Sequence, residues 1–407
     1  MESKRLPLFE AWIISLTSLL AVGVYAAYLV FTQGLIVTGM DDVVVWGLWI
    51  TADLSFIALS AGAFMSSGIV YLFRAEKFKP ILRVAILIGL IGYLCTLLTL
   101  VMDIGRPERF YYPFIFPGTH SVMWEVYWCI TIYTTMLVIE IAPIVGESEI
   151  AEKRFPFVTR IGNWLHKNML IFATIGVFAS LLHQASLGAL LGIVKAHPVW
   201  YKPTMAIMFI ISAMAAGPCT IIVVSMITSK ALRREVVSKE ILYELGKISG
   251  FILAAYLVFK GWDTVAMGYA YYPLRSEQLA LLSGSLYNVL FWGGEITLGG
   301  IVPAIILAIP RLRRTPIGLF TASILVMVGL VLFRFDVNVY GLMLAYMSSF
   351  YLVPGRLTPS LSPILVGYTP TWVEWAVVIG VFAFGALVYT LGVKYLPLFT
   401  HEEEKGA

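Results

Sequence analysis

The chain has 407 residues, of which 59% are hydrophobic and only 13% are charged. Its mean hydropathy of +0.87 is higher than a soluble domain with a polar surface tolerates, so the composition excludes that class and indicates a polytopic membrane protein. The formal net charge of +4 is accounted for by basic loops beside a lipid membrane, and we therefore expect no nucleic-acid partner.

Apolar runs long enough to cross a bilayer recur about ten times along the chain. Because roughly 20 apolar residues span the hydrocarbon core as a helix, we expect an all-α fold with about ten transmembrane helices in one domain, residues 1–407, and no strands. The first run follows two basic residues but has no small-residue cleavage pattern, so we expect a helix rather than a signal peptide. The expected helices cover residues 10–33, 46–73, 81–102, 121–142, 168–192, 203–228, 248–268, 284–308, 317–334 and 373–395.

The loops divide into two kinds. About 20 of the 28 Lys and Arg residues fall on the side of the N-terminus, which predicts that both termini are cytoplasmic and that the chain lies in the cell (inner) membrane. The opposite face carries long loops rich in Tyr, Trp and Pro, which suit a docked subunit; an apolar stretch at 337–354 is expected there as a loop or re-entrant segment. These loops are 103–120, 193–202, 269–283 and 335–372.

Small residues predict where helices touch. Residues 60–63 read Ser-Ala-Gly-Ala, and residues 212–217 read Ser-Ala-Met-Ala-Ala-Gly, four helices later. Such faces allow close helix contacts in membranes. The spacing predicts two four-helix bundles, about 46–192 and 203–334, plus flanking helices.

Several redox cofactors are excluded by the sequence. Cys95, Cys129 and Cys219 each stand alone in a predicted helix, so neither an iron–sulfur cluster nor covalent haem is expected. Of the five histidines only His183 lies clearly within a span, which disfavours haem b, with His120 as its one conceivable partner. No nucleotide-binding or metalloprotease motif occurs, so we expect no metal site and no nicotinamide.

Ionisable residues at membrane depth are costly and mark sites or pathways. Most of them fall toward the outer face, while Glu295 lies near mid-membrane and Glu140 near the inner end of its helix. Glu125 and Glu295 have no basic neighbour in their own helices, which suits proton relay. The outer group comprises Asp53, Asp103, Arg106, Glu125, His183, Gln184, Lys260, Asp263, Arg334, Asp336 and Glu374.

A plainer interpretation exists for each group. Asp103 with Arg106, and Arg334 with Asp336, are expected to form interfacial salt bridges whose charges reach the headgroups, and Lys260, Asp263 and Glu374 are expected to behave similarly. His183, followed by Gln184 and Ser186, could equally bind a ligand carbonyl or form an interhelical hydrogen bond.

Sequence motifs along the whole chain carry a family resemblance. They include SAGAF at 60–64, DIGRPER at 103–109, MWEVYW at 123–128, HQASLGAL at 183–190, PVWYKP at 198–203, FWGGEITLGGIVP at 291–303, RFDVNVYG at 334–341 and YTPTWVEWA at 368–376. With them the chain resembles the NrfD/polysulfide reductase membrane subunit family. Within it, the chain is most similar to the ten-helix branch of the HybB hydrogenase anchor and the DsrP subunit of the DsrMKJOP complex. The nearer resemblance is to DsrP, or to the related subunit of the heterodisulfide-reductase-like menaquinol-oxidising complex.

The resemblance implies a quinone-binding subunit of a respiratory complex in anaerobic, sulfur-linked metabolism. It implies menaquinone as cofactor, with no haem or iron–sulfur cluster in this chain, and an extracytoplasmic ferredoxin-like iron–sulfur subunit as partner. A multihaem cytochrome c, a haem b membrane subunit and a cytoplasmic iron–sulfur subunit are further partners of a Dsr-type complex. The implied quinone-site residues are His183, Asp103, Glu125 and Tyr127, supported by Asp53 and Arg106.

A proton path is a related expectation, through Glu125, Glu295 and Glu140. It would let quinol oxidation at the outer face release protons to the exterior, with a carboxylate as the accepting base. The competing function is a proton or solute transporter without a redox role, for which broken helices at matching depths would be expected. A third option is a membrane anchor whose site has degenerated.

Overall fold

The computed structural model describes residues 6–194, 197, 199–269, 286–353 and 356–399. Within these ranges, ten helices are long and apolar enough to cross a membrane. The predicted all-α polytopic fold is therefore confirmed. The ten spans are Leu8–Gln33, Leu48–Leu72, Glu76–Asp103, Val122–Gly146, Met169–Gly192, Met205–Leu232, Lys239–Ala266, Leu286–Ala308, Pro316–Met343 and Trp372–Tyr395.

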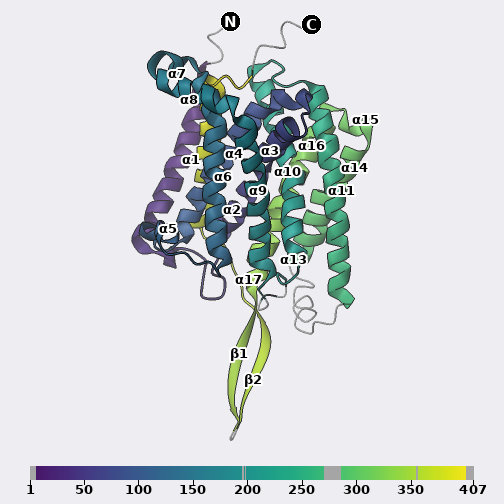
Figure 1. Ribbon diagram of the computed structural model, residues 1–407. Helices are drawn as coiled ribbons and strands as arrows, with labels where there is room; N and C mark the ends of the chain where they lie inside the picture. Colours follow the sequence, from purple (N-terminus) through teal and green to yellow (C-terminus); the bar gives the residue numbers. More distant parts are fainter. Residues whose placement is uncertain (1–5, 195–196, 198, 270–285, 354–355, 400–407) are drawn as a thin grey trace.

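The helices form one bundle (Figure 1). Several spans combine an α-helix with a π-helical segment, and short helices cover both ends of the bundle. The α-helices are α1 (Leu6–Gln33), α2 (Leu48–Leu59), α3 (Ala61–Ser67), α4 (Lys79–Asp103), α5 (Tyr112–Ile115), α6 (Val122–Gly146), α7 (Glu149–Arg154), α8 (Pro156–Lys167), α9 (Met169–Gly192), α10 (Met205–Leu232), α11 (Lys239–Tyr269), α13 (Leu286–Asn288), α14 (Val302–Ala308), α15 (Pro310–Arg313), α16 (Pro316–Phe335), α17 (Gly341–Met343) and α18 (Trp372–Tyr395). The π-helical segments are Gly68–Leu72, Val289–Ile301 and Asp336–Tyr340, and 3-10 turns cover Leu35–Val37, Glu76–Phe78 and Pro107–Arg109.

The start of α1 and the end of α18 lie at the same end of the bundle, as an even number of spans requires (Figure 1). We call this the terminal end. The opposite end carries the strands β1 (Leu344–Val353) and β2 (Arg356–Leu365) and is called the hairpin end. Helices α1 and α18 lie side by side, and the Trp12 indole N–H donates to the Thr390 hydroxyl over 3.2 Å.

Two small-residue helices cross at the centre of the bundle. A Cβ atom added at Gly62 on α3 would lie 2.7 Å from the Gly217 carbonyl oxygen on α10, and one added at Gly217 would lie 2.2 Å from the Gly62 nitrogen. Backbones can approach this closely only where side chains are absent. The sequence analysis expected each small-residue run at a helix contact, and the structure shows that the two runs contact one another.

The segment predicted as a loop or re-entrant stretch at 337–354 was wrongly assigned. The ninth span continues through Met343, because Val337, Val339 and Leu342 are buried against the bundle. Beyond it, β1 pairs antiparallel with β2, from Leu344 opposite Leu365 to Val353 opposite Arg356. The sequence analysis expected no strands, although a Pro-Gly dipeptide between two apolar runs is a turn signal. Most of the expected loop at 269–283 lies outside the described residues.

Candidate functional site

A group of polar side chains lies inside the helices of the first half of the chain, toward the hairpin end. We call Asp53, Tyr93, Asp103 and His183 the histidine cluster. The His183 Nδ1 atom and the Tyr93 hydroxyl are 2.7 Å apart, and the Trp49 indole N–H donates to Asp103 over 3.0 Å. Asp53 interacts electrostatically with both Asp103 and Tyr93. Helices α2, α4 and α9 thus bring these residues together.

Two atoms of this cluster have no hydrogen-bond partner among the described residues. They are His183 Nε2 and Asp53 Oδ1, and both are buried; the His183 side chain is 0% exposed. Buried polar atoms in folded proteins are almost always hydrogen-bonded. The pair therefore offers one ring nitrogen and one carboxylate oxygen to a ligand.

Glu125 connects the cluster to the outside of the bundle. Its side chain is exposed and accepts a 2.6 Å hydrogen bond from the Ser186 hydroxyl. Ser186 follows His183 by less than one turn of α9. The Cys129 sulfur lies 4.0 Å from the Ser186 hydroxyl oxygen. The exposed carboxylate is therefore bonded to a serine that lies three residues from His183 on the same helix.

A row of polar side chains leads from the cluster toward the terminal end. Ser180 lies near Tyr93 and Tyr133, whose rings meet edge to face with centroids 4.6 Å apart, and the buried Tyr133 hydroxyl has no hydrogen-bond partner among the described residues. Tyr133 in turn interacts electrostatically with Glu140, which accepts a 3.1 Å hydrogen bond from Ser67. Glu140 is only 4% exposed. The predicted path residues Glu125 and Glu140 therefore lie on opposite sides of the histidine cluster along the bundle.

Three other predicted residues lie near this site but make different contacts. The Tyr127 hydroxyl donates to the Phe110 carbonyl over 2.7 Å, so it fixes the aromatic loop that precedes α6. Gln184 donates to the Ile57 carbonyl over 3.3 Å, which joins α9 to α2. Arg106 is exposed.

A second polar group, the ion-pair cluster, comprises Tyr256, Lys260, Glu295, Arg334 and Asp336 in the second half of the chain. The Lys260 ammonium lies 2.7 Å from a Glu295 carboxylate oxygen, with both side chains at most 5% exposed. The Tyr256 hydroxyl donates to the same oxygen over 2.7 Å. Asp336 interacts with both Glu295 and Lys260. The Glu295 carboxylate is thus paired with a buried cation, whereas both Asp336 oxygens lack a hydrogen-bond partner among the described residues.

The expectation that these charges reach the headgroups was wrong. Lys260 and Asp263 are each 4% exposed, and Asp263 pairs with Lys202 over 2.6 Å. Neighbouring helices provide the partners that a single helix lacked, including Lys260 for Glu295.

The two predicted salt bridges, Asp103 with Arg106 and Arg334 with Asp336, are also absent from the ion pairs of the described residues. The Arg334 guanidinium instead donates to the Phe209 carbonyl and to Ser212, and its carbon lies 3.6 Å from the centre of the Phe209 ring.

Glu374 has a structural role at the hairpin end. Its carboxylate accepts hydrogen bonds from the backbone amides of Gly39 and Thr371, both over 2.9 Å, and from the Tyr368 hydroxyl. It therefore caps α18 and ties it to the segment before α2, instead of forming the expected interfacial pair. Burial, followed by the bond to Glu374, raises the pKa of Tyr368 above its usual value.

The sequence analysis missed Trp49, Tyr93, Ser180 and Tyr133. Each is an ordinary residue of an apolar span, and only the packing of α2, α4, α6 and α9 places it beside a charged or titratable group. An aromatic hydroxyl or indole N–H inside a span requires a polar partner, and this was the one signal that could have identified them.

The fold and buried polar clusters define a polytopic membrane subunit with ionisable groups in its interior. Residues 36–345 match the family model described as polysulphide reductase, NrfD, and the chain belongs to that family. It is 36% identical, over 99% of its length and 95% of the relative's, to the menaquinone reductase integral membrane subunit of Nitratidesulfovibrio vulgaris.

More distant relatives span almost the same length. The chain is 25% identical to a selenate reductase subunit of Mesobacillus selenatarsenatis, over 94% of this chain and 93% of that one. It is 28% identical to a putative dimethyl sulfoxide reductase membrane subunit of Halobacterium salinarum, over 96% and 91%. The predicted closeness to the DsrP subunit stays a prediction.

Proposed function

We propose that this chain is the quinone-binding membrane subunit of a menaquinol-linked oxidoreductase complex, with its quinone site at the histidine cluster. The observation that carries the proposal is the pair of buried atoms without partners, His183 Nε2 and Asp53 Oδ1. A relative named as a menaquinone reductase membrane subunit supports the choice of cofactor.

The donors and acceptors of the cluster suit a quinone. A neutral His183 that accepts from the Tyr93 hydroxyl carries its proton on Nε2 and can donate it to a carbonyl oxygen. Asp53, as a carboxylate without a buried cation in its cluster, can accept a hydrogen bond from a hydroxyl. When bound, menaquinone would supply a two-electron, two-proton couple, and the protein residues would hold it and handle the protons.

Proton movement is the second part of the proposal. Protons released at the cluster have a short route to Glu125 through Ser186. The row through Ser180 and Tyr133 leads instead to Glu140. Because quinol oxidation requires a base within hydrogen-bond reach, we assign Glu125 to release at the hairpin end and Glu140 to exchange with the terminal end. Glu295 belongs to the ion-pair cluster, where its carboxylate is paired with the Lys260 ammonium.

We further propose that the terminal end is cytoplasmic, as the basic residues predict. The hairpin end would then dock an extracytoplasmic ferredoxin-like iron–sulfur subunit, which receives or supplies the electrons. A Dsr-type complex would add a multihaem cytochrome c, a haem b membrane subunit and a cytoplasmic iron–sulfur subunit.

The alternative is a proton or solute transporter without a redox role. The long π-helical segment Val289–Ile301 contains Glu295 and favours that alternative, because π-helical segments are frequent at functional sites. The buried ion pair between Glu295 and Lys260 argues against a transported ion at Glu295.

The test is to purify the protein from native membranes in mild detergent and to measure bound menaquinone by extraction and mass analysis. We expect quinone in the wild type and in the control His166→Ala, whose histidine is exposed at the terminal end. His183→Ala should lose most of it. Absence of quinone from all three proteins, or equal retention, would contradict the proposal and favour the transporter.

A further inference from the structure

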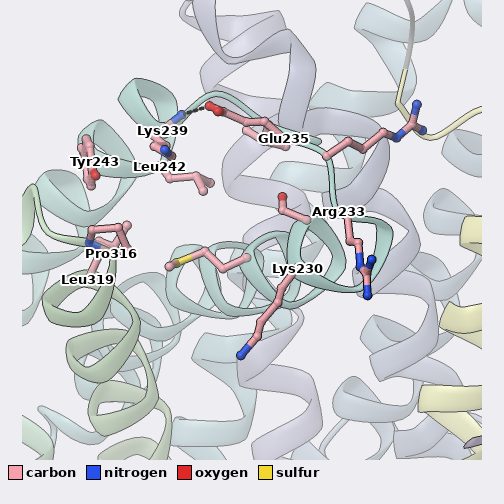
Figure 2. Close-up of a pocket in the computed structure, with 12 residues that line it drawn as sticks. Lys230, Arg233, Glu235, Lys239, Leu242, Tyr243, Pro316 and Leu319 are labelled. Carbon is pink, nitrogen blue, oxygen red and sulfur yellow. Dashed lines mark hydrogen bonds between the residues drawn. The ribbon is translucent and has the colours of Figure 1, made fainter. Parts of the chain in front are cut away.

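A hollow of about 360 Å³ opens at the terminal end of the bundle, where α10 ends and α11 and α16 begin. Helix α10 packs against both of the other helices. Figure 2 shows Pro316 and Leu319 on one side of the hollow and Arg233 on the other. It is remote from the histidine cluster, which lies toward the hairpin end.

The rim of the hollow is strongly basic. Lys230, Arg233, Arg234 and Lys239 line it, with Glu235 as the one acid among its lining residues. Glu235 is already engaged, because its carboxylate accepts the Lys239 backbone amide over 2.8 Å. The four cations are exposed, and none forms an ion pair with another residue that the structure describes.

Other basic residues at the same end do have acidic partners. Arg83 lies 2.6 Å from Glu147, and Lys77 lies 3.6 Å from Glu244. The hollow therefore concentrates four cations against the single carboxylate of Glu235. An anionic group such as a phosphate would complement the positive charge of this hollow.

The backbone places one of these cations in an uncommon conformation. Arg233 has φ 53° and ψ 33°, the left-handed conformation that ends α10, a position usually taken by glycine or asparagine. Its amide bonds back to the Ser229 carbonyl. A strained residue that retains a long cationic side chain at the mouth of a basic hollow is an observation that points to function.

The inner wall of the hollow is apolar. Leu242 and Leu319 line it from two neighbouring transmembrane helices and are 4% and 1% exposed. Met226 continues this wall along α10. The hollow therefore combines a cationic rim at headgroup level with an apolar wall that runs into the membrane.

We propose that this hollow binds one acidic glycerophospholipid from the membrane leaflet at the terminal end. The phosphate would lie among Lys230, Arg233, Arg234 and Lys239, and an acyl chain would lie against Leu242 and Leu319. A soluble phosphate would contact only the cationic rim, whereas a lipid would contact both the rim and the apolar wall. Basic pockets between transmembrane helices bind acidic lipid headgroups. This lipid links α10, α11 and α16.

The test uses native mass spectrometry of the full chain, purified in mild detergent, delipidated and titrated with dioleoylphosphatidylglycerol or dioleoylphosphatidylcholine. The variant neutralises the rim with Lys230→Gln, Arg234→Gln and Lys239→Gln, and leaves the Arg233 backbone untouched. The matched control neutralises three exposed arginines at the same end, through Arg154→Gln, Arg311→Gln and Arg314→Gln. Thermal midpoints in detergent verify that all three proteins are folded.

We expect the wild type and the control to bind phosphatidylglycerol alike, and the rim variant to bind it roughly tenfold or more weakly. Phosphatidylcholine binding should not change. Equal phosphatidylglycerol binding by all three proteins would overturn the proposal. Displacement of the lipid by millimolar inorganic phosphate would also overturn it, because the site would then bind a soluble anion. A rim variant that keeps its lipid but loses a soluble subunit of the native complex would overturn it as well, because the rim would then bind an acidic protein surface.

Discussion

The two halves of the bundle differ in whether their buried carboxylates are paired with cations. In the histidine cluster, Asp53 and Asp103 share their surroundings with His183 and Tyr93, and no Lys or Arg ion-pairs with them among the described residues. In the ion-pair cluster, Lys260 lies 2.7 Å from Glu295, and Arg334 interacts electrostatically with Glu295 as well. Among the described residues, the first site therefore has no ion-paired cation, whereas the second holds a buried ion pair beside an Asp336 carboxylate that has no hydrogen-bond partner.

This difference separates a chemical role from a structural one. A carboxylate without a counterion gains or loses a proton readily, which suits a site that handles quinol protons. A paired carboxylate such as Glu295 holds helices together through its ion pair. We propose that the halves are repeats of one unit, because α3 and α10 contact each other at small residues and the two membrane spans that contain them are each followed within two residues by an arginine at φ 53°, Arg74 and Arg233.

The largest expected effect comes from breaking the compensated cluster. Lys260→Met leaves Glu295 buried without its cation, and removal of one partner of a buried pair costs about 3–5 kcal/mol. Thermal unfolding in detergent should show a clearly lowered midpoint. The control is Lys247→Met, an exposed residue on the same helix, which should unfold like the wild type; equal midpoints for both variants would remove the structural role of Lys260.

A smaller loss is expected at the crossing of α3 and α10. Gly217→Ala places a methyl group 2.2 Å from the Gly62 nitrogen, and overpacking of this kind costs about 1–3 kcal/mol. Gly261→Ala on α11 meets nothing within 4 Å and should be neutral or slightly stabilising, because alanine is the better helix former. Comparison of the two thermal midpoints checks the prediction, and an unaffected Gly217→Ala protein would contradict the close crossing.

The polar row of the first half is tested through Glu140. Glu140→Gln keeps the size of the side chain and removes its proton exchange, so quinone-linked turnover of the native complex should fall about tenfold or more. The bound quinone should be unchanged. Glu152→Gln, at an exposed position of α7, provides the control. Full turnover with Glu140→Gln would remove this residue from the proton route.

The mildest effect concerns alkaline stability. The pKa of Tyr368 is raised by burial and by Glu374, so above a pH of about 10 the unfolded chain loses this proton before the folded protein does. Its contribution to stability is complete below that pH and is lost as the pH rises. Tyr368→Phe removes this proton, so the thermal midpoint of the variant should fall less steeply between pH 10 and 11 than that of the wild type. The difference corresponds to at most about one proton released on unfolding. At pH 7 the variant should be less stable than the wild type. Identical slopes would contradict it.

The sequence predicted the spans well because apolar length is a property of each segment alone. It also predicted that residues 60–63 and 212–217 each lie at a helix contact, because small residues mark such faces, but it did not predict that the two runs contact each other. It could not predict that Lys260 pairs with Glu295, or that Tyr93 lies against His183, because those contacts depend on how separate helices are packed and rotated. The hairpin after Met343 was missed because its apolar residues resemble those of a membrane segment.

The central claim is that the cluster without counterions, and not the compensated one, binds the quinone. The most direct measurement is photolabelling of native membranes with a photoreactive menaquinone analogue, followed by peptide mapping and competition with unlabelled menaquinone. We predict competed labels on peptides of α2, α4 and α9 that contain Asp53, Tyr93 and His183. Competed labels confined to the peptides around Glu295 and Arg334 would contradict the account.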